Sequence, residues 1–120
     1  MTPFGAHLRV LRAERGISQK DMAEALGVTA TYLSALERGR RGRPTFDLVN
    51  RMIGYLNIIW DEADELHRLA ALSDPKVTID TSECDPDAVL TANVLARRIN
   101  RLDQQQLERI LTILDEVKAR

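Results

Sequence analysis

The sequence has 120 residues, enough for one domain of ordinary size or for a small head with an appendage. Hydrophobic residues make up 44% and aromatic residues only 4%, so a packed core is feasible and must consist mainly of aliphatic side chains. The net charge of −1 taken alone argues against a nucleic-acid partner, and the single cysteine, Cys84, excludes an intrachain disulfide.

Helical spacing of apolar residues dominates from the start of the chain and predicts an all-α fold. The first helix is expected over Pro3–Arg15, and Gly16 ends it. A second helix begins at Ser18, whose spacing to Asp21 is that of a capping box, and Gly27 ends it in the left-handed conformation.

A third helix follows, with Thr29 as its N-terminal cap and Gly39 as its end. Leu33 and Leu36 are expected to point inward. The stretch Arg38–Pro44 reads RGRRGRP and contains no acidic residue. It is therefore predicted to be a basic loop.

Two further helices are expected before the helical spacing of apolar residues ends near Pro75. Thr45 caps a fourth helix, which is rich in leucine, isoleucine and methionine. A fifth helix is expected over Trp60–Leu72, and its buried residues are predicted to be Leu66, Leu69 and Leu72.

After Pro75 the apolar residues no longer follow the helical spacing. Lys76–Asp80 alternates polar and apolar residues, which predicts a short extended piece. A sixth helix is expected from Pro86 to about Asn100, and a seventh begins after Asp103. No internal repeat is evident.

The charge is distributed unevenly along the chain. Residues 1–58 carry nine basic and five acidic side chains, a net +4, whereas residues 59–120 carry eight basic and thirteen acidic ones, a net −5. A basic front and an acidic rear would orient the molecule on a polyanion, although chance fluctuation is the alternative. The first residues form neither a signal peptide nor a membrane span, so we expect a soluble cytoplasmic protein.

The stretch Ser18–Gly39 meets three requirements of two short helices that cross at close range. Ala23 supplies a small residue where the helices touch, Gly27 a tight turn four residues later, and Leu33 an apolar residue inside the second helix. A helix presented in this way can enter the major groove of DNA, which is about 12 Å wide.

This stretch resembles the lambda-repressor-like, Cro/CI-type (XRE) helix-turn-helix family, and the similarity covers about Phe4–Leu69. The matching positions are Gln19, Ala23, Gly27, Leu33, the ending Glu37-Arg38-Gly39 and the basic loop that leads to Pro44. The resemblance implies a five-helix DNA-binding head and a bacterial, sequence-specific transcriptional regulator, for example a repressor.

The resemblance also implies which residues contact double-stranded DNA. Gln19 would bind a backbone phosphate, and Thr29 would cap its helix and touch a phosphate. The residues that face the major groove would be Ala30, Thr31, Tyr32 and Ala35, with Ser34 and Arg38 at its edge. The loop residues that contact phosphates would be Arg40, Arg41 and Arg43. The alternatives are that Gln19 is an ordinary exposed helix residue, that Tyr32 packs on the surface of the protein, and that the loop is only a run of solvated charges.

One departure from the family pattern concerns base recognition. Many members place Gln, Asn or Arg at the first groove-facing positions, where this chain has Ala30 and Thr31. These side chains contact a thymine methyl group or make one hydrogen bond, which discriminates less between bases. We therefore expect specificity to rest partly on DNA shape.

The second half is predicted to pair two heads, because specific sites usually need two heads about 34 Å apart. The last helix carries an apolar stripe at helical spacing, formed by Leu107, Ile110, Leu111, Leu114 and Val117. We expect this stripe to form a homodimer, or a higher oligomer, that matches a two-fold symmetric operator. The alternative is that the helix folds back on its own head. The prediction is thus a helix-turn-helix domain over 1–73 and a linker with C-terminal dimerisation helices over 74–120.

Two functions are compatible with these features. The first is a transcriptional regulator, and the second is an antitoxin-like protein-binding module that also binds its own operator and uses its acidic half on a basic partner. An enzyme is not expected, because we find no Ser/Lys pair of a self-cleaving repressor, no His/Cys/Asp cluster and no phosphate-binding loop with a Lys-Ser/Thr pair. We accordingly expect no catalytic residue, no metal and no cofactor.

Overall fold

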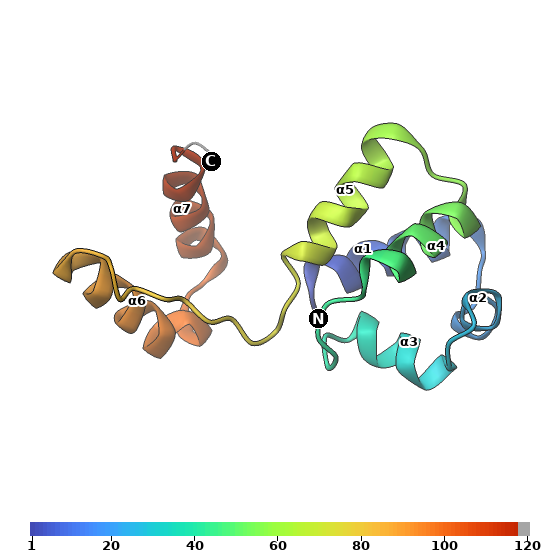
Figure 1. Cartoon of the computed structure of the whole chain (residues 1–120), viewed down its shortest axis with the longest axis horizontal. Helices are drawn as coiled ribbons and strands as arrows, with labels where there is room; N and C mark the ends of the chain where they lie inside the picture. Colours follow the sequence, from blue (N-terminus) through green and yellow to red (C-terminus); the bar gives the residue numbers. More distant parts are fainter. Residues whose placement is uncertain (118–120) are drawn as a thin grey trace. The chain divides into compact units, whose positions relative to one another are not determined.

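The computed structural model describes residues 1–117 and confirms the all-α fold (Figure 1). Seven α-helices and a short 3-10 helix make up the described part of the chain, in which no strand is present. The chain divides into two compact units, Met1–Val77 and Thr78–Arg120. We call the first unit the head and the described part of the second, residues 78–117, the C-terminal segment. The assignment of separate functions to residues 1–73 and 74–120 stays a prediction.

Five helices form the head: α1 (Pro3–Arg15), α2 (Gln19–Leu26), α3 (Ala30–Glu37), α4 (Phe46–Leu56) and α5 (Trp60–Ala71). Helix α1 packs against α3 and α5, α2 packs against α3 and α4, and α4 packs against α5. Figure 1 shows α2 and α3 joined by a short turn, with the loop after α3 beside the N-terminus.

Polar side chains start the first four helices. The side chains of Thr2, Ser18, Thr29 and Thr45 each accept a backbone N–H from the following turn. Such a cap typically stabilises a protein by about 1 kcal/mol. Gly16 and Gly27 follow the first two helices with φ values of 64° and 73°, which a glycine adopts without a steric penalty. The predicted caps at Ser18, Thr29 and Thr45 and the predicted glycine ends of the first two helices are therefore confirmed.

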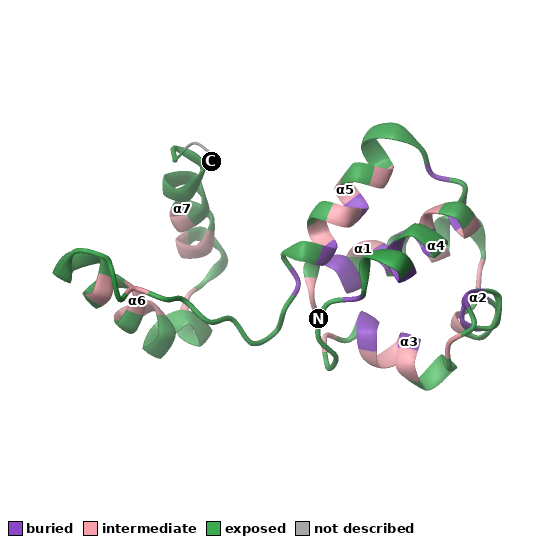
Figure 2. Cartoon of the chain, in the orientation of Figure 1, coloured by how far each residue is buried: buried purple, intermediate pink, exposed green. Residues whose placement is uncertain are grey.

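A single aliphatic core holds the five helices together, as the composition requires. Figure 2 shows the buried residues concentrated on the helices of the head. The largest side chains that are almost completely buried include Phe4, Leu8, Met22, Leu33, Met52 and Leu66. Fully burying one such side chain typically contributes about 1.5–3 kcal/mol. The head therefore has a core of its own.

The burial predicted for three leucines of α5 is confirmed only in part. Leu66 is buried and Leu69 is partly buried against the core, but Leu72 is 61% exposed, because α5 ends at Ala71. Residues 77–80, within the predicted extended piece, belong to no helix, and no strand exists among residues 1–117 with which they could pair. Alternation of apolar residues alone does not make a strand without a partner that supplies hydrogen bonds.

The C-terminal segment contains α6 (Pro86–Arg98), a 3-10 turn (Ile99–Arg101) and α7 (Gln104–Asp115). The predicted capping box is confirmed, because Asp103 and Gln106 exchange side-chain and backbone hydrogen bonds. No described residue of this segment is buried, and Figure 2 shows it in the colours of exposed and intermediate residues. Among the described residues, no helix is long and apolar enough to cross a membrane.

Candidate nucleic-acid interface

Helices α2 and α3 are joined by a tight turn that the sequence sets residue by residue. Gly27 donates its backbone N–H to the carbonyl oxygens at the end of α2, and Val28 leads to Thr29. The Thr29 hydroxyl accepts the Tyr32 N–H at 3.0 Å, so this hydroxyl serves the cap of α3. Ala23 is only 1% exposed, as the predicted close approach of the two helices requires.

Helix α3 has one buried and one open face. Leu33 and Leu36 are buried in the core. Ala30 and Thr31, on the first turn, are exposed. Three further candidates are partly exposed, namely Tyr32, Ser34 and Ala35. The first turn of α3 is therefore open to a partner, whereas the opposite face holds the helix on the head.

A buried carboxylate links α1, α2 and α3. The Glu37 side chain is completely buried, and Arg12 binds it through two hydrogen bonds of 2.7 and 3.1 Å. The Gln19 amide donates to Glu37 Oε2 at 2.6 Å, and the Arg9 guanidinium lies 3.9 Å from the same oxygen. Because a buried charge is costly without partners, this cluster fixes how the three helices meet.

The cluster changes how Gln19 is interpreted. Its side chain is not simply solvated, since one amide proton is used on Glu37. Because Glu37 accepts this hydrogen bond at 2.6 Å, the buried carboxylate holds the Gln19 amide in one orientation. No local sequence pattern indicates that Arg12 is the partner of Glu37, because the two residues are 25 positions apart.

The basic residues after α3 have partners of their own in the head. Arg38 donates two hydrogen bonds to the Ser34 hydroxyl, one of them at 3.2 Å. The Arg41 guanidinium carbon lies 5.7 Å from the centre of the Tyr32 ring, a cation–π contact. Arg40 is exposed. The structure thus brings the side chains of Arg38 and Arg41 into contact with the open face of α3.

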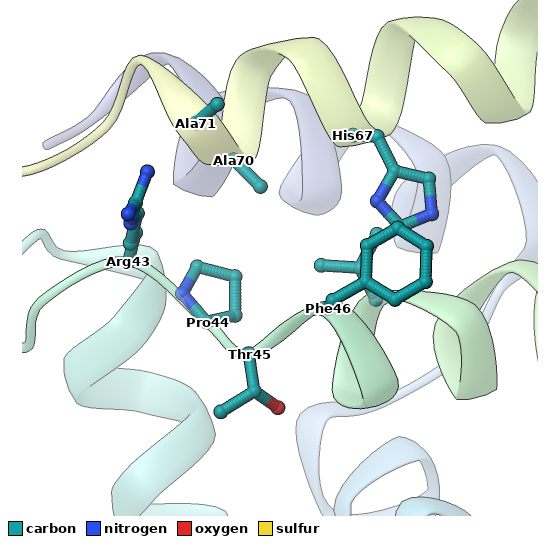
Figure 3. Close-up of a pocket in the computed structure, with 8 residues that line it drawn as sticks. Arg43, Pro44, Thr45, Phe46, His67, Ala70 and Ala71 are labelled. Carbon is teal, nitrogen blue, oxygen red and sulfur yellow. The ribbon is translucent and has the colours of Figure 1, made fainter.

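Arg43 lies at the other end of the loop, beside the end of α5. Its backbone N–H donates to Asp74 Oδ1 at 3.2 Å, and its Nε lies 3.8 Å from Asp74 Oδ2. Figure 3 shows its side chain directed toward the end of α5, at the rim of a pocket that continues past Pro44 and Thr45.

The same pocket contains an aromatic feature that the sequence analysis missed. Phe46 is 72% exposed and stacks on His67, with ring centres 4.5 Å apart (Figure 3). His67 Nε2 also lies 2.9 Å from Asn50 Oδ1. Among the described residues, no group of His, Cys, Asp or Glu side chains is arranged to hold a metal ion.

The sequence matches known proteins over the head. A helix-turn-helix domain family model matches residues 3–72. The HTH-type transcriptional repressor RghR of Bacillus subtilis is 34% identical over 61 residues, which is 51% of this chain and 45% of that protein. The uncharacterised HTH-type transcriptional regulator RghRB of the same organism is 30% identical over 61 residues, 51% of this chain and 44% of that protein.

A third relative is the HTH-type transcriptional regulator SinR of Bacillus subtilis, 29% identical over 65 residues, which is 53% of this chain and 59% of that protein. The chain thus spans about half the length of the curated relatives that it matches. No solved structure matches.

Proposed function

The chain belongs to the helix-turn-helix domain family, and from this premise we propose that it is a sequence-specific transcriptional regulator that binds double-stranded DNA as a homodimer. The observation that carries the proposal is the open first turn of α3, with Ala30 and Thr31 exposed beside a loop of three arginines. Helix-turn-helix proteins place the N-terminal residues of this helix against base edges in the major groove.

The proposed DNA contacts divide into two kinds. Base edges would be contacted by Ala30, Thr31, Tyr32 and Ala35, with Ser34 and Arg38 at the groove edge. Phosphates would be contacted by Gln19, Thr29, Arg40, Arg41 and Arg43. Because Ala30 and Thr31, the first residues that face the groove, are small, phosphate contacts would supply much of the affinity and little of the sequence information.

The proposed homodimer depends on the C-terminal segment. Leu111 and Leu114 are 58% and 57% exposed on α7, and Leu90 is 62% exposed on α6. Leu107 and Ile110 are partly exposed on the same face of α7, and Val117 follows two residues after the helix ends, at 71% exposure. An apolar stripe of this kind favours burial against a second copy, and two-fold symmetry would match a symmetric operator.

The regulator proposal is tested by selecting bound fragments from genomic DNA on the immobilised full chain and footprinting them. We expect a protected site with two related half-sites. Thr31→Ala and Tyr32→Ala should change the preferred sequence more than the affinity for unrelated DNA. If selection enriches no sequence, or if neither substitution alters the preference, the placement of α3 in the groove is wrong.

The second candidate, an antitoxin-like module that binds a basic protein, is favoured by one observation. Four acidic residues lie on the first turns of α5, within the head: Asp61, Glu62, Asp64 and Glu65. Reversing the charge of Asp61 and Glu62 should abolish capture of such a partner and leave DNA binding intact. Capture that is unaffected by the reversal would rule out this surface.

A further inference from the structure

The loop from Arg38 to Pro44, here called the arginine loop, contacts α3 through Arg38 and Arg41, and at its two glycines it also approaches the N-terminus and the end of α5. At Gly39, where φ is 76°, a Cβ atom would lie 2.8 Å from the Thr2 side chain, so only glycine fits against the N-terminus. At Gly42, a Cβ atom would lie 3.7 Å from Asp74 Oδ1. The segment between these two points contains Arg40 and Arg41.

Asp74 makes the second of these two contacts and faces the loop with both carboxylate oxygens. Oδ1 accepts the Arg43 backbone N–H at 3.2 Å, and Oδ2 lies 3.8 Å from the Arg43 guanidinium. The ion pair between Arg43 and Asp74 is long, and the two side chains are 58% and 45% exposed. This ion pair therefore contributes little energy. The hydrogen bond from the backbone to the charged oxygen is the stronger element.

Asp74 can act as an anchor because the residue before it is fixed. Ser73 is only 4% exposed, and its hydroxyl accepts the Phe4 N–H at 3.0 Å and donates to the Leu69 carbonyl oxygen. The start of α1 and the end of α5 are therefore joined at Ser73. Asp74, the next residue, connects this junction to the arginine loop through its hydrogen bond with the Arg43 backbone.

We propose that Asp74 is a positioning residue for DNA binding, which holds the arginine loop through the Arg43 backbone N–H so that Arg40 and Arg41 stay beside α3. The inference rests on the proposed function, since it concerns the same DNA surface. If Asp74 holds the loop, removing its carboxylate should weaken DNA binding, which is the opposite of what its negative charge alone predicts. A carboxylate close to DNA repels phosphates, so on electrostatic grounds its removal should strengthen binding.

The test compares Asp74→Ala, which removes the acceptor, with Asp74→Asn, which keeps an oxygen acceptor but removes the charge. Asp80→Ala is the control for the loss of one negative charge, because within residues 1–117 the Asp80 carboxylate accepts hydrogen bonds from nearby Ser82 and from no other residue. The probe is the tightest-binding genomic fragment from the selection. We expect Asp74→Ala to bind it about three- to tenfold more weakly, and Asp74→Asn and Asp80→Ala to bind at least as tightly as the unsubstituted chain.

A second readout does not depend on DNA. Trypsin should cleave at Arg40 or Arg41 several times faster in Asp74→Ala than in the unsubstituted chain, and Asp74→Asn should restore the slow rate. The inference is overturned if Asp74→Ala binds as tightly as Asp80→Ala and is cleaved at the original rate, or if Asp74→Asn behaves like Asp74→Ala. A failure of the selection to enrich any DNA would overturn the proposed function, while the cleavage rates would still decide the role of Asp74.

Discussion

The head and the C-terminal segment are both helical and both amphipathic, yet only the head buries its apolar residues. Fifteen apolar side chains of the head are buried, from Phe4 in α1 to Ala70 in α5. In the C-terminal segment no described residue is buried, although α7 starts with a complete capping box and both α6 and α7 carry apolar stripes. Well-formed helices are therefore not evidence of a complete fold, because most of the stability of a helix in a protein comes from packing of its apolar face.

The largest expected effect is on the buried cluster of the head. Arg12→Ala leaves the Glu37 carboxylate buried without its main partner, and we expect a loss of about 3–5 kcal/mol in the free energy of unfolding. Urea denaturation followed by circular dichroism measures this loss. Arg9→Ala is the matched control, because Arg9 is 52% exposed and 3.9 Å from Glu37, and it should cost less than about 1 kcal/mol. Equal effects of the two substitutions would show that burial of the pair is not what stabilises the head.

The next effect concerns the C-terminal segment. Replacing Leu111 and Leu114 with Glu should leave the unfolding midpoint of the head unchanged, since neither side chain belongs to its core. Binding to the selected fragment should fall about 100-fold or more, because two linked heads bind far more tightly than one. The control places two glutamates on the other side of α7, at the exposed positions Gln105 and Thr112, and should bind normally. If both double variants bind equally well, the stripe does not pair the heads.

A smaller effect distinguishes the basic residues of the two regions. Replacing Arg40, Arg41 and Arg43 with Ala should reduce the slope of log affinity against log salt by up to about 5 for the proposed homodimer, since each of its two heads loses three phosphate contacts and each contact accounts for about 0.9. Replacing Arg97, Arg98 and Arg101, which are exposed in the C-terminal segment, removes the same charge and should leave the slope nearly unchanged. Equal reductions from the two triple variants would mean that the contacts are not localised to the arginine loop.

The smallest effect comes from the helix caps. Ser18→Ala removes the side-chain oxygen that accepts the Asp21 N–H and should cost the head about 1 kcal/mol. Asp103→Ala removes the equivalent bond to Gln106 in the C-terminal segment and should lower helix content there without shifting the unfolding of the head. Thermal unfolding followed by circular dichroism separates the two responses. A common shift of the melting curve would mean that the two units unfold together.

Local features of this fold could be predicted from the sequence because they depend on neighbouring residues. The caps at Ser18, Thr29, Thr45 and Asp103 and the left-handed glycines at helix ends require only one turn of chain. The apolar spacing likewise identified most of the core of the head. The end of α5 was harder to predict, because the exact position of the helix end decides the exposure of Leu72.

The candidate site was predicted less completely than the fold, for a different reason. The resemblance named the residues of α3 and of the arginine loop, but not what each one touches in the head. The contacts of Glu37 with Arg12 and of Arg43 with Asp74 join residues 25 and 31 positions apart, and no local pattern encodes them. The stack of Phe46 on His67 was missed because each residue looks unexceptional alone.

The most direct test of the contrast between the two units is the mass of the protein in solution, measured by light scattering at micromolar concentration. The intact chain should have twice the 13.5 kDa mass of one copy, and a chain that ends after Val77 should stay folded and have the mass of one copy. An intact chain of 13.5 kDa, or a shortened chain that still pairs, would contradict the view that the C-terminal segment joins two heads.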